Sequence, residues 1–165
     1  MPRVKKTVLP SVPIPVQWQS AISDHVIALA WSPDGRWLAA AAVSGPISLF
    51  DGATEQHTTV LAGHHLGTTS LSWHAGSTCL ASAGQDGLVR LWDVATGCEQ
   101  HALEAGSTWV EHVAWSPTGD LLATAAGRTL RLWHATGRLQ QQYPAHASTI
   151  AALQWAPRKI GRAHV

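Results

Sequence analysis

Tryptophan recurs along this chain at a fixed spacing. Trp31, Trp73 and Trp115 are each separated by 42 residues, and Trp155 follows after 40. A second set of bulky aromatic residues keeps the same period: Phe50, Trp92 and Trp133. Because a spacing of about 40 residues cannot be a helical or strand periodicity, it indicates a structural unit that is repeated along the chain.

Each repeat contains four short apolar runs separated by turn residues, which is typical of β-strands. In the first unit the predicted strands are Val26–Trp31, Trp37–Val43, Ile47–Phe50 and His57–Leu61. The second unit predicts Thr68–Trp73, Cys79–Ala83, Leu88–Trp92 and Glu99–Leu103. The third unit predicts Val110–Trp115, Leu121–Ala125, Thr129–Trp133 and Leu139–Tyr143. Four strands per unit of about 40–45 residues predict an all-β fold, a partial β-propeller of four-stranded antiparallel blades.

The second unit carries the clearest marker residues. Gly63-His64, Asp86 and Trp92-Asp93 resemble the markers of the WD-repeat family of β-propellers, and the resemblance covers roughly residues 21–158. It implies a structural tetrad formed by His64, Ser82, Asp86 and Trp92. In such a tetrad the contacts run from the indole through the hydroxyl and the imidazole to the carboxylate, and a fully satisfied network of this kind makes a blade rigid.

Serine, histidine and aspartate together also allow a catalytic-triad interpretation. We disfavour it because the sequence around Ser82 shows no nucleophile elbow and no oxyanion donors. The other units depart from the tetrad. In the third unit the corresponding residues are Gly106, Thr124, Gly127 and Trp133. In the first unit they are Ile22, Ala40, Ser44 and Phe50.

Several residues outside the repeat-locked positions are candidates for a partner-binding rim at one end of the blades. The set comprises Trp109, Gln85, Arg128, His25 and Glu111. Exposed aromatic and arginine side chains are frequent anchors in peptide recognition. The alternatives are that Trp109 packs against its own loop and that Arg128 is a solvated turn charge. Trp37 aligns with Cys79 and Leu121 and is predicted to fill space between blades.

The composition narrows the possible functions. A net charge of +1, with Lys and Arg scattered, argues against nucleic-acid or anionic-membrane binding. No apolar run is long enough to cross a bilayer, and no secretory signal is visible. We expect no metal site, because the histidines are not clustered with other histidine, cysteine or carboxylate ligands. They occur singly along the chain, at His25, His57, His74, His101, His112 and His134. No cofactor motif is present, and two cysteines, Cys79 and Cys98, suit a reducing cytoplasmic compartment.

The predicted organisation has six segments. These are a proline-rich arm (1–15), a strand at Val16–Ala21 with the first blade (16–60), the second blade (61–105), the third blade (106–145), the start of a fourth blade (146–158) and a tail (159–165). In the fourth unit an inner strand is expected at Ile150–Trp155. The tail is expected to be non-native, since it can be back-translated as AAG ATC GGA AGA GCA CAC GTC, which reads as the start of a common sequencing adapter. The alternative is a short basic tail. The chain is therefore expected to be part of a larger propeller.

These patterns favour a non-catalytic WD-repeat scaffold that binds a protein or peptide partner. The alternative is a sensory or regulatory propeller domain of a larger enzyme whose catalytic part lies outside this chain. A propeller scaffold by itself does not decide between them.

Overall fold

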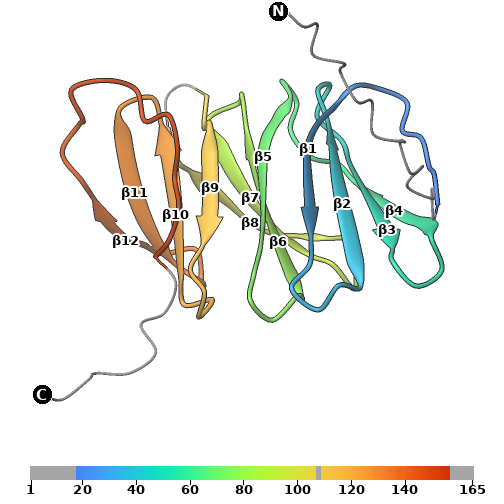
Figure 1. Ribbon diagram of the computed structural model, residues 1–165. Coiled ribbons are helices and arrows are strands. Elements are labelled where there is room, and N and C mark those ends of the chain that lie inside the picture. Colours follow the sequence, from blue (N-terminus) through green and yellow to red (C-terminus); the bar gives the residue numbers. More distant parts are fainter. Residues whose placement is uncertain (1–17, 107–108, 157–165) are drawn as a thin grey trace, which may run out of the picture.

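The computed structural model describes residues 18–106 and 109–156, which form three four-stranded antiparallel sheets (Figure 1). The first sheet contains β1 (Val26–Trp31), β2 (Trp37–Ala42), β3 (Ile47–Asp51) and β4 (Gln56–Leu61). The second contains β5 (Thr68–Trp73), β6 (Cys79–Gly84), β7 (Leu88–Asp93) and β8 (Glu99–Glu104). The third contains β9 (His112–Trp115), β10 (Leu121–Ala126), β11 (Thr129–His134) and β12 (Leu139–Gln142).

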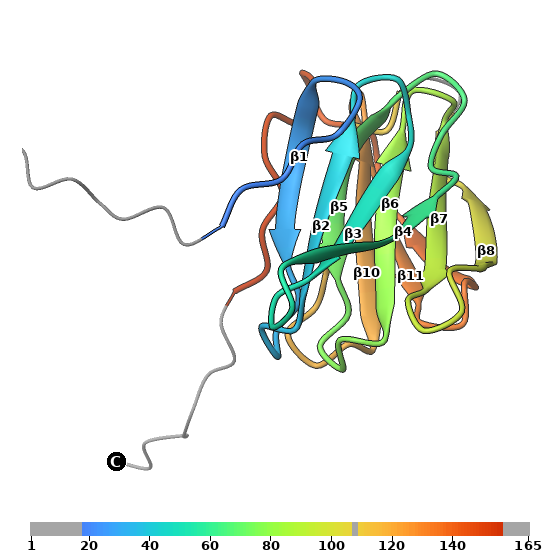
Figure 2. The ribbon, with the colours of Figure 1, turned by 90° about the vertical axis from the view of Figure 1, so that its right-hand side faces the viewer.

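In every sheet the strands are hydrogen-bonded in the order in which they follow along the chain. The first strands of the three sheets, β1, β5 and β9, lie next to one another (Figure 1), and the sheets stack as successive layers (Figure 2). This arrangement confirms the predicted partial β-propeller: each sheet is one blade, and the first strand of each blade is the inner one.

Tight turns set the register inside each blade. Between β1 and β2 the amide of Gly35 donates to the carbonyl of Ser32 at 2.9 Å, and Gly35 has a φ of 72°. Glycine adopts this left-handed conformation without a steric penalty. The turn places Trp31 opposite Leu38, so the apolar side chains of the two strands face the same side of the sheet.

The core lies between neighbouring blades. The middle strands supply small side chains at this contact: Ala39 and Ala81 are 0% exposed, and Ala123 is 3% exposed. Larger residues such as Leu49 and Leu80 fill the layer between the first and second blades. Trp37 also packs against this cluster, as predicted for a filler between blades. Small residues let the sheets approach closely, and dense packing then excludes water.

Two predicted strands are not found in the described residues. Residues 18–21 of the expected strand at 16–21 form no strand, and Trp18 instead packs on Phe50 with ring centroids 6.0 Å apart. The expected inner strand at 150–155 is also not assigned, because no described strand pairs with it. The third inner strand begins at His112, two residues later than expected. The predicted arm (1–15) and tail (159–165) lie outside the described residues.

Two of the repeat-locked tryptophans, Trp73 and Trp155, donate a hydrogen bond to the blade before them, whereas the indole Nε1 of Trp115 is buried without a partner among the described residues. The indole Nε1 of Trp73 donates to the carbonyl of Ala30 at 2.9 Å, and that of Trp155 donates to the carbonyl of Ala114 at 2.9 Å. Trp155 thus makes the same contact with the third blade that Trp73 makes with the first. Trp31 has no described blade before it and is 50% exposed, whereas Trp73 is 7% exposed.

We predict that the 165-residue chain expressed alone self-associates through the open face of β1. Ile27, Leu29 and Trp31 are all exposed on this strand, and burying them removes apolar surface from water. Size-exclusion chromatography with light scattering should show species larger than the monomer, and Leu29→Lys should shift them toward the monomer. Leu66→Lys, at a comparably exposed loop position, is the control. A sharp wild-type monomer peak with cooperative melting contradicts the prediction.

Candidate functional site

Four side chains of the second blade form a continuous hydrogen-bonded chain. The indole Nε1 of Trp92 donates to Ser82 Oγ at 2.8 Å. Ser82 Oγ lies 2.9 Å from His64 Nε2, and His64 Nδ1 lies 2.8 Å from Asp86 Oδ1. The contacts run in the order that the WD-repeat resemblance implies. They connect β7, β6, the loop before β5 and the turn between β6 and β7.

Burial decides the protonation of this network. His64 is 2% exposed, and burial lowers the pKa of its imidazole below 6.5, outweighing the opposing effect of Asp86. Burial alone would raise the pKa of Asp86, but hydrogen bonds, His64 first, hold it below 3.8. At neutral pH His64 is therefore neutral. Its Nδ1 donates a hydrogen bond to the Asp86 carboxylate, and its Nε2 accepts a hydrogen bond from the Ser82 hydroxyl.

The network leaves Ser82 no catalytic role. Ser82 is 0% exposed, and its hydroxyl oxygen is engaged by both Trp92 and His64. A nucleophilic serine must reach the substrate carbonyl. This Ser–His–Asp set is a structural element of the blade.

Arg90 and Glu99 extend the network and were missed by the sequence analysis. Arg90 Nη2 lies 3.2 Å from Asp86 Oδ2, and Arg90 Nη1 lies 2.6 Å from Glu99 Oε2. The network therefore reaches β8 as well. The sequence contained one indication of this extension. Arg90 lies two residues before Trp92, and residues two apart in a strand have their side chains on the same face.

Gly84 makes room for the imidazole. A Cβ atom at Gly84 would lie 2.2 Å from His64 Nδ1 and 2.7 Å from Asp86 Oδ1. Real Cβ atoms do not approach other atoms so closely, so any larger residue would displace the His64–Asp86 pair. The tetrad thus depends on Gly84, although Gly84 makes none of its side-chain hydrogen bonds.

The third blade replaces part of the network with a different arginine contact. Trp133 Nε1 still donates to Thr124 Oγ1 at 3.0 Å. Arg131 donates from Nη1 to the carbonyl of Ala105 and from Nε to Gln142 Oε1 at 2.9 Å. In the first blade, Ala40 and Phe50 are both 3% exposed and make the corresponding position apolar.

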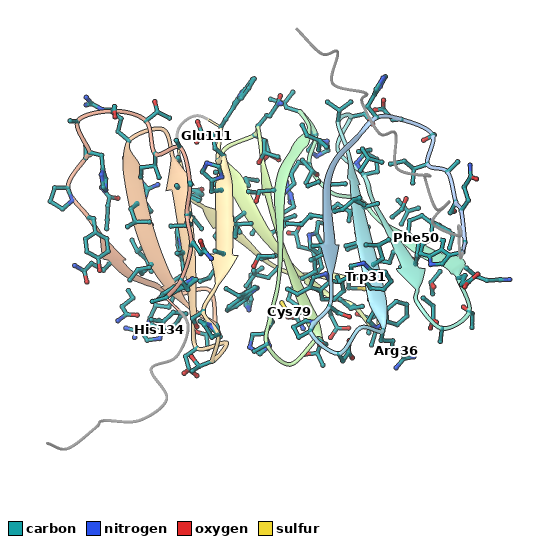
Figure 3. The ribbon with its side chains drawn as sticks, viewed as in Figure 1. Trp31, Arg36, Phe50, Cys79, Glu111 and His134 are labelled. Carbon is teal, nitrogen blue, oxygen red and sulfur yellow. The ribbon has the colours of Figure 1, made fainter. Side chains whose placement is uncertain are left out.

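The five predicted rim residues lie in the loops at one end of the blades. Glu111 marks this end in Figure 3. Trp109, His25 and Arg128 are exposed, whereas Gln85 and Glu111 are partly buried. They come from the segments before β1 and β9 and from the turns that follow β6 and β10. Successive blades bring these loops to a common surface.

Glu111 has a local role within this surface. Its Oε2 accepts a hydrogen bond from the amide of Gly127 at 2.8 Å, so it holds the turn between β10 and β11. Leu66, which the sequence analysis missed, is 65% exposed in the loop before β5. An isolated leucine between His65 and Gly67 was the only available signal. Trp109, at the same end of the blades, is 54% exposed.

No long apolar helix suited to crossing a membrane occurs within the described residues. In the same part of the chain, no three His, Cys, Asp or Glu side chains gather as a metal site would require.

The family model described as "WD domain, G-beta repeat" matches the chain three times, at residues 17–51, 55–93 and 97–134. The chain belongs to the WD-repeat family. It is 32% identical over 126 residues to the chromatin assembly factor 1 subunit FAS2 homolog of Oryza sativa subsp. japonica, covering 70% of this chain and 25% of that protein. It is 31% identical over 113 residues to an uncharacterised WD repeat-containing protein of Schizosaccharomyces pombe, covering 67% and 19%.

Solved structures show the same WD-repeat propeller fold. A chain of the mitotic checkpoint complex superposes with a TM-score of 0.76 at 24% identity, covering 84% of this chain and 43% of that chain. U3-55K superposes with a TM-score of 0.75 at 16% identity, covering 80% and 43%. The WD-repeat chain thus spans less than half of these solved chains and about a quarter or less of the two relatives.

We predict that Asp86→Ala destabilises the domain by roughly 1–3 kcal/mol, the cost of leaving buried polar groups unpaired. His64 and Arg90 both lose a partner in this variant. Urea unfolding measures the change, and Asp120→Ala, at an exposed turn position, is the control. A change within error for Asp86→Ala contradicts the structural role of the network.

We also predict that stability falls as the solution is acidified below about pH 6.5. The pKa of His64 is lowered in the folded state, so below 6.5 the unfolded chain takes up a proton that the folded chain does not. The stabilisation is present above pH 6.5 and is lost as pH falls through the folded pKa. Unfolding free energies between about pH 7 and pH 5 should show a weaker pH dependence in His64→Gln. Equal slopes contradict the prediction.

Proposed function

We propose that this WD-repeat chain is a non-catalytic scaffold whose rim binds a protein or peptide through Trp109. The observation that carries the proposal is the 54% exposure of this indole at the end of the blades where the loops converge. Large aromatic side chains dominate binding energy at interfaces when a partner covers them.

The backbone beneath Trp109 is held firmly. Val110 is 0% exposed, and its amide donates to the carbonyl of Gly84 at 3.0 Å. The carbonyl of Val110 accepts a hydrogen bond from the hydroxyl of Thr69 in the second blade. An anchor on a fixed backbone loses little conformational entropy on binding, which favours affinity.

Leu66 and Arg128, from two other loops at the same end of the blades, extend the proposed surface. Leu66 precedes β5, the inner strand beside β9, and Arg128 lies in the turn after β10. Both are exposed. An aromatic anchor with an apolar neighbour and a guanidinium at the edge suits a peptide that carries an apolar side chain and a carboxylate.

The family supports a scaffold role, since WD-repeat proteins typically mediate protein interactions. The burial of Ser82 supports a function without catalysis. The proposed location is the cytoplasm, which is consistent with the free thiols of Cys79 and Cys98.

Selection from a phage-displayed random peptide library tests the proposal. Peptides selected on the wild-type chain should bind Trp109→Ala about 10-fold or more weakly, as expected for loss of an interface hot spot. Leu139→Ala, at an exposed apolar position on β12, is the matched control and should bind as the wild type does. The rim proposal is contradicted if none of the selected peptides binds Trp109→Ala more weakly than the wild-type chain.

A further inference from the structure

A groove lies at the opposite end of the molecule from the rim, between the first and second blades. Arg36, on its wall, and Glu111, at the rim, mark the two ends in Figure 3. The groove encloses about 650 Å³, within the size range of ligand-binding clefts. Its walls come only from the first two blades, so the groove is complete within the described residues.

The charged side chains that line this groove are Asp34, Asp93 and Arg36. The hydroxyl of Ser32 holds the pKa of Asp34 below its usual range, and the amide of Thr96 does the same for Asp93. Both carboxylates are therefore ionised at neutral pH. The guanidinium of Arg36 lies 4.9 Å from the ring centroid of Trp37, and its Nε lies 3.9 Å from Asp51 Oδ2. With two carboxylates and one guanidinium, the side chains that line the groove carry a net negative charge.

The first blade contributes an open strand edge to the same groove. Thr58 and Thr59 of β4 line it, opposite the turn from Asp93 to Gly97. Among the described strands β4 pairs only with β3, so no strand is hydrogen-bonded to its other edge. Free N–H and C=O groups along a strand edge can pair with an extended peptide.

We propose that this groove binds an extended peptide segment that carries a lysine or arginine side chain. The peptide backbone runs beside β4, and its cation is attracted by the carboxylates of Asp34 and Asp93. Opposite charge at a partly enclosed surface favours this side chain over an acidic one. The site does not depend on the rim, because it uses none of the rim residues.

Fluorescein-labelled octapeptide pools test the groove by fluorescence anisotropy. Each pool has random flanks and one fixed central residue, either arginine, alanine or glutamate. The arginine pool should bind the wild-type chain at least several-fold more tightly than the other two. The double variant Asp34→Asn/Asp93→Asn keeps acceptor oxygens for the turns and should lose this preference. Asp120→Asn, in the equivalent exposed region of the third blade, is the control and should retain it.

Two further variants test whether the arginine pool binds in the groove and not at the rim. Thr58→Arg places a cation on the wall and should weaken binding of the arginine pool without altering the turns. Trp109→Ala should leave that binding unchanged, since the rim lies at the other end. Equal binding of the three pools, retention of the preference in the double variant or in Thr58→Arg, or its loss in Trp109→Ala would each overturn the groove assignment. Circular dichroism verifies that each variant is folded.

Discussion

Contact between neighbouring blades is the interaction on which the rest of this structure depends. A single four-stranded sheet has two faces and cannot bury both of them alone, so each blade is stabilised by the next one. Alanines in the middle strands let the sheets approach, and a tryptophan at the end of each inner strand can reach back to the preceding blade. The contrast between Trp31 and Trp73 shows the effect directly, since the same repeat position is half exposed or buried depending on its neighbour.

Among the described residues, buried side-chain N and O atoms have hydrogen-bond partners with two exceptions, Arg90 Nε and Trp115 Nε1. In the second blade the side chains from Trp92 to Glu99 form a continuous series of contacts. In the first blade Ala40 and Phe50 take the places of the serine and the indole, and both are buried. In the third blade Arg131 contacts a backbone carbonyl instead of an aspartate. A half-satisfied network would be less stable than either solution.

A rigid frame of this kind leaves function to its ends. The middle strands β2, β6 and β10 are buried between blades, whereas the loops at one end carry an exposed indole and those at the other end border a negatively charged groove. The two surfaces use different chemistry, one apolar and aromatic, the other polar with an open strand edge. Under the two proposals made above, they bind different peptide segments without competition.

The sequence by itself determined the blades and much of the tetrad. Its 42-residue period located the strands of all three sheets, with most boundaries within two residues, because turn residues and apolar runs act locally. It could not give the contacts of Arg131 with Ala105, 26 residues away, or the groove where the first blade meets the second. Residues 18–21 of the strand expected at 16–21 and the strand expected at 150–155 are not assigned as strands, because a strand is defined by its hydrogen-bonded neighbour. The arginine contact, the groove and the strand assignments depend on which segments the tertiary structure brings together, and local sequence does not determine this.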